Sequence, residues 1–408
     1  MIKSVFIRNF LNLSLNQGVN ILVAIIATPI LFKNLGESQY GLVNLSFSIV
    51  LILSIIVSYG YHLNGPKRIS LLHSIEEKKE LINQIISLRI SLALIISVFI
   101  LLFSYYTILF KGYEIILMFS VVILFSEALN PVFYLQGEDN LSLLALTNAT
   151  SKLLYLLLII FLVISPDDSY IVNFLFGTSL TLVYVIFWIY IYIKNKIIFK
   201  WPNIENLRFR IKENFKFFLS SFAGHISIHS GIIILSLFSN NSELGKFALA
   251  HRVAILLRMI PVFIIQSALQ KASLINENKK SFLDKYLNYY YYRGLVLTFF
   301  VAIATSLSSK WIIIFLSGEQ IDYSQEVLVL LSFVPFLGML NSKNILKILV
   351  NENKEILNKA TWISAFIMIV VSLILSYYHG GKGLAIALLF SELASFIVHS
   401  ILLNNDNK

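Results

Sequence analysis

The chain has 408 residues, of which 57% are hydrophobic and only 13% are charged, whereas about 25% of the residues in soluble domains are charged. This composition excludes a soluble enzyme and indicates an integral membrane protein, and the absence of cysteine excludes disulfides, thiol nucleophiles and thiolate metal sites. The net charge of +10 is explained by basic cytoplasmic loops, which orient membrane proteins, better than by a nucleic-acid surface.

Hydrophobic stretches long enough to cross a bilayer, about 17–25 residues each, recur along almost the whole chain. The first six predicted spans are 9–32, 42–61, 85–108, 115–135, 141–164 and 169–193. The second six are 216–238, 246–271, 286–309, 325–347, 359–377 and 383–403. We therefore predict an all-α integral membrane protein with about 12 transmembrane helices in two six-helix bundles around a central cavity, an arrangement used by transporters with internal repeats.

The loops between the predicted spans differ in charge on the two sides of the membrane. If the N-terminus is cytoplasmic, the cytoplasmic segments hold 22 Lys and Arg residues and the opposite side holds five, Lys33, Lys111, Lys246, Lys310 and Lys382. This asymmetry matches the positive-inside rule and predicts that both termini are cytoplasmic. The longest basic segment, at 194–216, lies midway between the two sets of six predicted spans. We therefore predict a six-helix half at 1–193, a basic cytoplasmic linker at 194–215 and a second six-helix half at 216–408.

Polar side chains recur at four-residue spacing inside three predicted spans. Because four residues are just over one helical turn, each set lies on one face of its helix. The sets are Asn12, Asn16 and Asn20 in the first span, Asn148 and Lys152 in the fifth, and Ser221, His225 and His229 in the seventh. Two interpretations stay open for these residues: hydrogen bonds between helices, or a polar lining of the cavity.

Charged residues inside the spans cost about 2.5–3.5 kcal/mol each on insertion scales. Arg89 and Arg293 lie near predicted helix ends, where snorkelling or an ion pair explains them. Lys152, Arg252 and Arg258 are deeper, and Arg258 lies about 18 Å along its predicted helix at about 1.5 Å per residue. Charges at that depth usually face a water-filled cavity. These three cations are therefore candidate substrate-binding residues for an anionic solute.

Two carboxylates, Glu127 and Glu392, also lie within predicted spans. With His225 and His229, they are candidates for coupling transport to a proton or sodium gradient. The first span has no Asp or Glu, which disfavours an exporter of organic cations, and no GxxxxGK[ST] loop indicates ATP hydrolysis. The predicted loops opposite the cytoplasm are too short to carry catalytic acids. We therefore expect a transporter without a cofactor or metal site, rather than a membrane-embedded polymerase or ligase.

Four motifs resemble those of Wzx-type polysaccharide flippases. A proline-ended first helix and an LG…YG turn occur in TPILFKNLGESQYGLVNLSFSIV, from Thr28. The end of the second helix and the basic loop after it are similar to SYGYHLNGPKRIS, from Ser58. The fourth-to-fifth helix region is similar to NPVFYLQGEDNLSLLALTNATSKL, from Asn130, and the start of the eighth helix to SELGKFALAHRV, from Ser242. The order of the motifs extends the resemblance over essentially the whole chain and to the multidrug/oligosaccharidyl-lipid/polysaccharide exporter superfamily.

The resemblance implies translocation of an undecaprenyl-pyrophosphate-linked oligosaccharide repeat unit, of O-antigen or capsule type, across the bacterial inner (plasma) membrane. The cationic cavity typical of that family suits a pyrophosphate group, and Lys152, Arg252 and Arg258 are the candidates for this role in the present chain. The further partners that the resemblance implies are membrane lipids, a polysaccharide polymerase and a chain-length regulator. A multidrug or metabolite exporter of the same fold is the alternative.

Overall fold

The computed structural model describes residues 2–106, 110–278 and 280–406, except for the side chains of residues 2–17, 270, 274, 277, 278, 280, 281 and 406. The described residues form helices joined by turns and short non-helical stretches, with no strand among them, which confirms the predicted all-α fold. The first helices are α1 (Ile2–Ser58), α2 (Tyr61–Leu71), α3 (Ile75–Tyr106), α4 (Glu114–Ser120), α5 (Val122–Ala128), α6 (Val132–Gly137), α7 (Leu141–Leu162), the short 3₁₀ helix η2 (Pro166–Asp168) and α8 (Ser169–Lys194). The remaining helices are α9 (Ile204–Ser236), α10 (Asn241–Asn278), α11 (Lys280–Leu307), α12 (Ser309–Ser317), α13 (Asp322–Leu331), α14 (Val334–Leu340), α15 (Ser342–Val350) and α16 (Lys354–Asp406).

By length and composition, ten helical segments in the described part of the chain could cross a membrane. Two of them, Gly18–Leu71 and Lys354–Asn405, are long enough for two crossings. Each bends at a glycine with a positive φ, 71° at Gly36 and 56° at Gly380, a conformation that glycine adopts without steric cost. Each long segment therefore contains two of the predicted spans, and all twelve predicted spans have a counterpart in the structure.

Two candidate spans are divided into three short helices each. The fourth predicted span corresponds to α4, α5 and α6, and the tenth corresponds to α13, α14 and α15. A proline lies in each, Pro131 before α6 and Pro335 near the start of α14, and proline cannot donate the backbone hydrogen bond that continues a helix. Asn130 lies at the break between α5 and α6, and Asn341 at the break between α14 and α15. Both asparagines therefore stand where the regular backbone ladder is interrupted.

The contacts divide the chain into two compact units, Met1–His225 (the first unit) and Ile226–Lys408 (the second unit). The division falls inside α9, so one continuous helix contributes residues to both units. The predicted linker, 194–215, includes a non-helical stretch at 197–203, and its residues from Ile204 onward form the first turns of α9. The boundary between the units thus lies later in the chain than the predicted start of the second half at 216.

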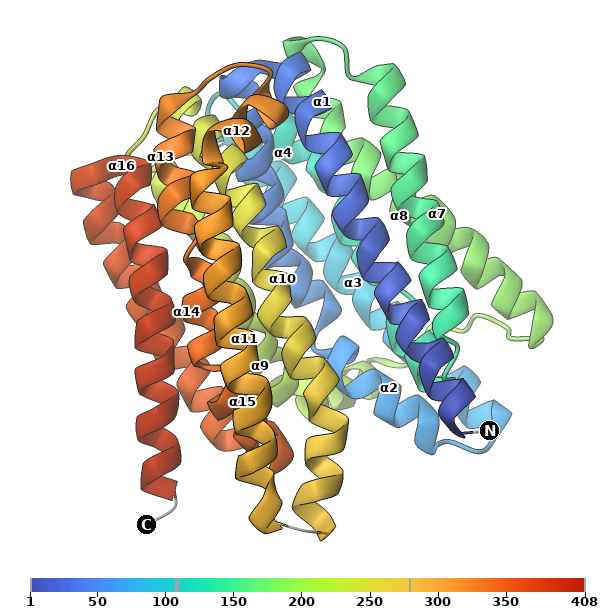
Figure 1. The fold of residues 1–408 in the computed structure, drawn as a ribbon. Coiled ribbons are helices and arrows are strands. Elements are labelled where there is room, and N and C mark those ends of the chain that lie inside the picture. The colour runs from blue at the N-terminus through green and yellow to red at the C-terminus, as the bar shows by residue number, and fades with distance from the viewer. Residues whose placement is uncertain (1, 107–109, 279, 407–408) are drawn as a thin grey trace. The chain divides into compact units, whose positions relative to one another are not determined.

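In the first unit, α1 packs against α7, and α8 packs against both α5 and α7. Figure 1 shows α1 in blue and α7 and α8 in green. Ile85 and Phe133 belong to one buried core cluster, and Leu124 belongs to another. Gly177 allows α8 to approach the backbone of α5 closely, since a Cβ at this position would lie 2.7 Å from the backbone nitrogen of Ile123. This close packing fixes the helices that carry Asn148, Lys152 and Glu127.

In the second unit, α10 packs against α11, α13, α14 and α15, and α16 packs against α13, α14 and α15. Figure 1 shows these helices in yellow (α10), orange (α13 to α15) and red (α16). Leu287 and Leu346 belong to a buried core cluster that joins α11 to α15. Because α14 and α15 contact both α10 and α16, side chains from α10 and α16 can meet beside them.

Candidate functional site

An arginine of α10 and a glutamate of α16 form an ion pair in the second unit. Arg258 Nη2 lies 2.6 Å from Glu392 Oε1. Arg258 is near the middle of its candidate span, Asn241–Leu269, and Glu392 is near the middle of the part of α16 that follows Gly380. Sequence analysis gave these residues separate roles, in substrate binding and in coupling. The structure brings them into direct contact.

The two side chains of this ion pair differ in exposure. Arg258 retains 39% of its accessible surface, whereas Glu392 retains only 11%. A guanidinium at mid-span depth is unfavourable against acyl chains and is expected to face water. Glu392 is instead enclosed by helices, and its Oε2 lies against α14, where a Cβ on Gly338 would be 3.4 Å away. The arginine is therefore the accessible member of the pair.

A buried polar cluster follows Glu392 along α16. Asn341 Nδ2 donates to Ser395 Oγ at 3.2 Å and lies 3.2 Å from His399 Nδ1, which is also 2.8 Å from the carbonyl oxygen of Ser395. Asn341 and His399 are both buried. Glu392, Ser395 and His399 are spaced at i, i+3 and i+7, so they share one face of the helix. Sequence analysis missed this cluster, although the polar spacing within the last predicted span was a signal that could have found it.

Arg252 and Arg258 do not share one face of α10. In an ideal helix, the side chain six residues after another is rotated by about 240° around the helix axis, so the directions of Arg252 and Arg258 differ by about 120°. Arg252 is half-buried. His251, seven residues before Arg258, lies close to the face of Arg258, and its ring stacks on Phe247 with centroids 5.4 Å apart. The residue that accompanies Arg258 on its own face is therefore His251, which sequence analysis did not propose.

Lys152 and Asn148 of α7 both interact with α8 in the first unit. Lys152 Nζ lies 3.9 Å from the centroid of the Phe176 ring, a cation–π contact that stabilises a partly desolvated ammonium group. The Tyr184 hydroxyl donates to Asn148 Oδ1 at 3.2 Å. Tyr155 packs edge-on against Phe176, with centroids 5.2 Å apart. The ammonium group of Lys152 is thus stabilised by an aromatic ring of α8, which packs against Tyr155 of α7.

Glu127, at the end of α5, belongs to a polar group around the helix break. Asn130 Nδ2 donates to Glu127 Oε2 at 3.2 Å, and Arg89 Nη1 donates to the carbonyl oxygen of Asn130 at 3.1 Å. The guanidinium of Arg89 lies 5.1 Å from the centroid of the Phe133 ring. The expectation that Arg89 lies near a helix end was wrong. Because α3 begins at Ile75, before the predicted span, Arg89 falls in mid-helix and is only 1% exposed.

A pair of histidines lies in the first unit where α2 meets α9. His225 Nδ1 is 3.0 Å from the carbonyl oxygen of Ser221, and the His225 ring centroid is 6.5 Å from that of His62. His62 itself lies between two hydroxyls, with Nδ1 3.1 Å from Ser58 Oγ and Nε2 3.4 Å from Ser221 Oγ. Sequence analysis proposed His225 but not His62, which lies within the quoted SYGYHLN motif.

The other predicted lining residues lie in different parts of the chain. Asn20 of α1 and His229 of α9 are half-buried. Asn20 belongs to the first unit and His229 to the second. Asn12 and Asn16 are outside the residues whose side chains the structure describes.

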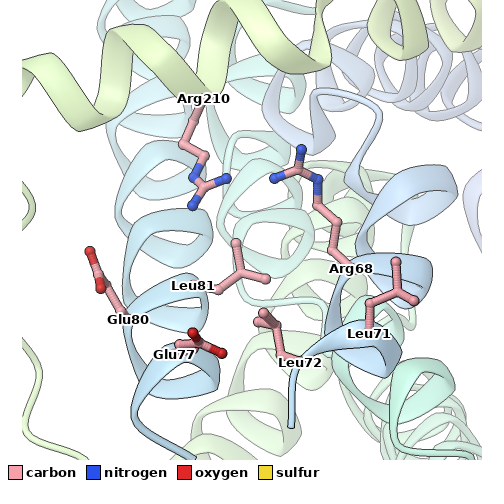
Figure 2. Close-up of a pocket in the computed structure, with 7 residues that line it drawn as sticks. All are labelled: Arg68, Leu71, Leu72, Glu77, Glu80, Leu81 and Arg210. Atoms are coloured by element: carbon pink, nitrogen blue, oxygen red, sulfur yellow. The ribbon is translucent and has the colours of Figure 1, made fainter. Parts of the chain in front are cut away.

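The first unit also contains a cavity of about 380 Å³ between α2, α3 and α9, shown in Figure 2. Its lining is Arg68, Leu71, Leu72, Glu77, Glu80, Leu81 and Arg210. Figure 2 shows Arg68 of α2 and Arg210 of α9 extending toward each other. Glu213 pairs with both arginines, at 3.0 Å from Arg210 Nη1. Because acidic groups balance the arginines, this cavity is not a cationic site for an anion.

The chain matches the family described as polysaccharide biosynthesis protein over residues 6–270. A protein of Shigella dysenteriae described as an O-antigen transporter is 25% identical over 395 residues, which cover 94% of this chain and 96% of the relative. A protein of Escherichia coli (strain K12) with the same description is 24% identical over 394 residues, which cover 94% of this chain and 93% of the relative.

Solved structures with the same fold are also found. Lipid II flippase MurJ in an inward closed conformation gives a TM-score of 0.79 at 16% identity, covering 98% of this chain and 87% of MurJ. An inward-facing multidrug resistance MATE family transporter of the MOP superfamily gives 0.74 at 16% identity, covering 97% of this chain and 99% of that one. The fold is therefore that of the MOP superfamily. The family match spans more than half of the chain and confirms the resemblance predicted from the motifs, so this chain, which has ten segments that could cross a membrane in its described part, belongs to the polysaccharide biosynthesis protein family.

Proposed function

We propose that the chain is a flippase that moves an undecaprenyl-pyrophosphate-linked oligosaccharide repeat unit, of O-antigen or capsule type, across the bacterial plasma membrane. Its relatives described as O-antigen transporters and the fold shared with a lipid II flippase support this substrate class. In the proposed mechanism the two six-helix halves, 1–193 and 216–408, alternate access to a central cavity, with 194–215 as a cytoplasmic linker and both termini in the cytoplasm.

The observation that carries the proposal is the accessible guanidinium of Arg258 near the middle of its span. A pyrophosphate presents several anionic oxygens, and a guanidinium binds two such oxygens at once through parallel N–H groups. Arg252 and Lys152 are the proposed additional cations. Asn12, Asn16, Asn20, Asn148, His225 and His229 are the proposed polar lining. A polysaccharide polymerase and a chain-length regulator are the proposed downstream partners, because a translocated repeat unit must then be joined to a growing chain.

The direct test uses proteoliposomes that contain the purified protein and a radiolabelled undecaprenyl-pyrophosphate-linked oligosaccharide. A membrane-impermeant glycosidase measures the fraction of the oligosaccharide that reaches the accessible leaflet. We expect the protein to raise the rate of leaflet exchange well above that of protein-free vesicles. Arg258→Ala should lower this rate at least tenfold, since a charge-assisted contact is worth roughly 1.5–3 kcal/mol and tenfold corresponds to about 1.4 kcal/mol.

Arg293→Ala is the matched control, because Arg293 is an exposed arginine whose guanidinium interacts with Tyr289 on its own helix. We expect this variant to retain the wild-type rate. Vesicles that export cationic dyes while leaving the labelled oligosaccharide in place would contradict the proposal and favour the multidrug exporter.

A further inference from the structure

We propose that Arg258 exchanges its anionic partner during transport: a phosphate oxygen of the substrate replaces Glu392, and the released carboxylate binds a proton. This inference rests on the proposed function, because it assigns the substrate anion to the same arginine. It adds the step by which movement of the substrate is coupled to a proton gradient, and it assigns that step to Glu392.

Because Arg258 is more exposed than Glu392, a ligand reaches the arginine of the ion pair and not the carboxylate. Arg258 is reached from outside the helix packing, since 39% of its surface is accessible, while Glu392 is 11% accessible. A ligand can therefore approach the guanidinium without displacing a helix. Glu392 cannot follow a ligand into the open, because its second oxygen lies against the backbone of α14 at Gly338. When the arginine turns to a phosphate, the carboxylate is left behind among α10, α14 and α16.

The charge balance of the exchange requires a proton. Before the exchange, the guanidinium and the carboxylate neutralise each other. After it, the phosphate neutralises the guanidinium and the carboxylate has no partner. An unpaired charge in an enclosed site costs several kcal/mol, and such groups take up a proton instead. Glu392 gains one proton from water, becoming a neutral carboxylic acid, and returns it when the substrate leaves and the ion pair forms again.

The polar cluster on α16 provides groups that can relay this proton. Ser395 is almost one turn beyond Glu392, and His399 is one turn further on the same face. Asn341 contacts both of them, within 3.2 Å. These hydroxyl, amide and imidazole groups lie on the side of Glu392 that leads to the C-terminal end of the helix. The proposed route for the proton therefore runs along α16, away from the side on which Arg258 is exposed.

Several other charged groups on the neighbouring helices have ion-pair or hydrogen-bond partners of their own. On α13, Tyr323 donates to Glu243 of α10, and Glu326 pairs with Lys382 of α16. On α15, Lys343 and Lys347 pair with Asp284 of α11. Further titratable or cationic groups near the middle of these helices include His251 and Arg252 of α10, His399 of α16 and His229 of α9, whereas α14 carries no titratable side chain. Within the described residues, Arg258 is the cation that an ion pair joins to Glu392.

The test measures substrate binding and proton uptake together. Full-length protein in weakly buffered nanodiscs is titrated with an undecaprenyl-pyrophosphate-linked oligosaccharide, whose doubly esterified pyrophosphate has no group that titrates near neutral pH. A pH-indicator dye records the protons taken up. For the wild type we expect uptake of up to one proton per bound lipid and an affinity that falls as the pH rises, because ionised Glu392 competes for Arg258. For Glu392→Gln we expect no uptake, an affinity that no longer changes with pH, and binding about tenfold tighter, as for loss of a modest charge-pair coupling.

Two controls separate the exchange from general effects. Glu326→Gln removes a carboxylate of the exposed Lys382 pair in the same unit and should leave binding and proton uptake as in the wild type. Undecaprenol, which has no phosphate, should cause no proton uptake. If Glu392→Gln fails to insert, Glu392→Met replaces it. This variant also removes the titrating group, so it should abolish proton uptake, and uptake like that of the wild type would overturn the inference.

The inference is overturned if Glu392→Gln takes up protons like the wild type, or if undecaprenol causes the same uptake. Leaflet exchange of the labelled oligosaccharide distinguishes this failure from that of the proposed function. A protein that flips the oligosaccharide but shows no effect of Glu392→Gln on proton uptake retains its function and loses the coupling step. A protein that flips nothing fails the proposed function itself.

Discussion

Replacement of Arg258 by methionine removes the partner of an enclosed carboxylate while keeping a long side chain at the same position. Glu392 remains against α14 with 11% of its surface accessible. Leaving a buried charge without its partner costs about 3–5 kcal/mol. Because some solvent reaches this pair, we expect Arg258→Met to destabilise the second unit by about 3 kcal/mol, near the lower end of that range.

The double variant Arg258→Met/Glu392→Gln isolates the cause of this loss. It removes the carboxylate as well as its partner, so no uncompensated charge remains, and apolar or neutral replacements of buried ion pairs are often tolerated. We expect it to recover most of the stability that the single variant loses. Transport should not recover, since the guanidinium proposed to bind the substrate is still missing.

Thermal unfolding of the purified variants in detergent measures this difference. For a unit the size of Ile226–Lys408, each kcal/mol corresponds to about 2–4 °C, so the single variant should lose on the order of 6–12 °C. A double variant as unstable as the single variant would refute the reasoning, because the loss would then not come from an unpaired carboxylate. An unchanged Tm for Arg258→Met would show that solvent already screens the pair.

Two further predictions concern the first unit. Lys152→Met should lower oligosaccharide exchange at least tenfold, because the ammonium group that lies over the Phe176 ring is a proposed substrate cation, and Lys152→Arg should retain the exchange. The matched control is Lys194→Met, which removes an exposed lysine over a tyrosine ring and should have no effect. Gly177→Ala should destabilise the protein by about 1–3 kcal/mol, since its Cβ would lie 2.7 Å from the backbone of α5. Gly224→Ala, where the Cβ meets open space, should be neutral or stabilising by up to about 1 kcal/mol. Equal shifts in Tm for the two glycine variants would contradict the steric explanation.

Sequence analysis predicted the twelve spans because the length and hydropathy of a span are local properties. It did not predict where the spans are irregular. The breaks at Asn130 and Asn341 depend on nearby prolines and on side chains from other helices, and the joining of spans through Gly36 and Gly380 depends on backbone angles. These features follow from tertiary packing, which a hydropathy pattern does not contain.

The candidate site shows the same limit. Residue type and depth pointed to Arg258 and to Glu392, but they could not show that the two residues form one ion pair across α10 and α16. The position of Arg89 along its helix was also predicted wrongly. The charged residues from Ile75 onward, before the predicted span, are helical and belong to α3, so Arg89 lies in the middle of this helix. Contacts between residues far apart in sequence decide which charges are accessible, and a single sequence does not contain them.

The two units use the same chemical groups in opposite ways. In the first unit the arginine is enclosed, since Arg89 is 1% exposed and bonded to the backbone of Asn130, while Glu127 is half-buried and accepts from the Asn130 side chain. In the second unit the arginine is accessible and the carboxylate, Glu392, is enclosed. An anionic substrate needs an accessible cation, and coupling needs a carboxylate that loses its partner when the substrate binds. The second unit meets both requirements with one ion pair. In the first unit the guanidinium of Arg89 is enclosed, and within the described part of the chain no ion pair joins it to a carboxylate. Glu392 is therefore a better coupling candidate than Glu127.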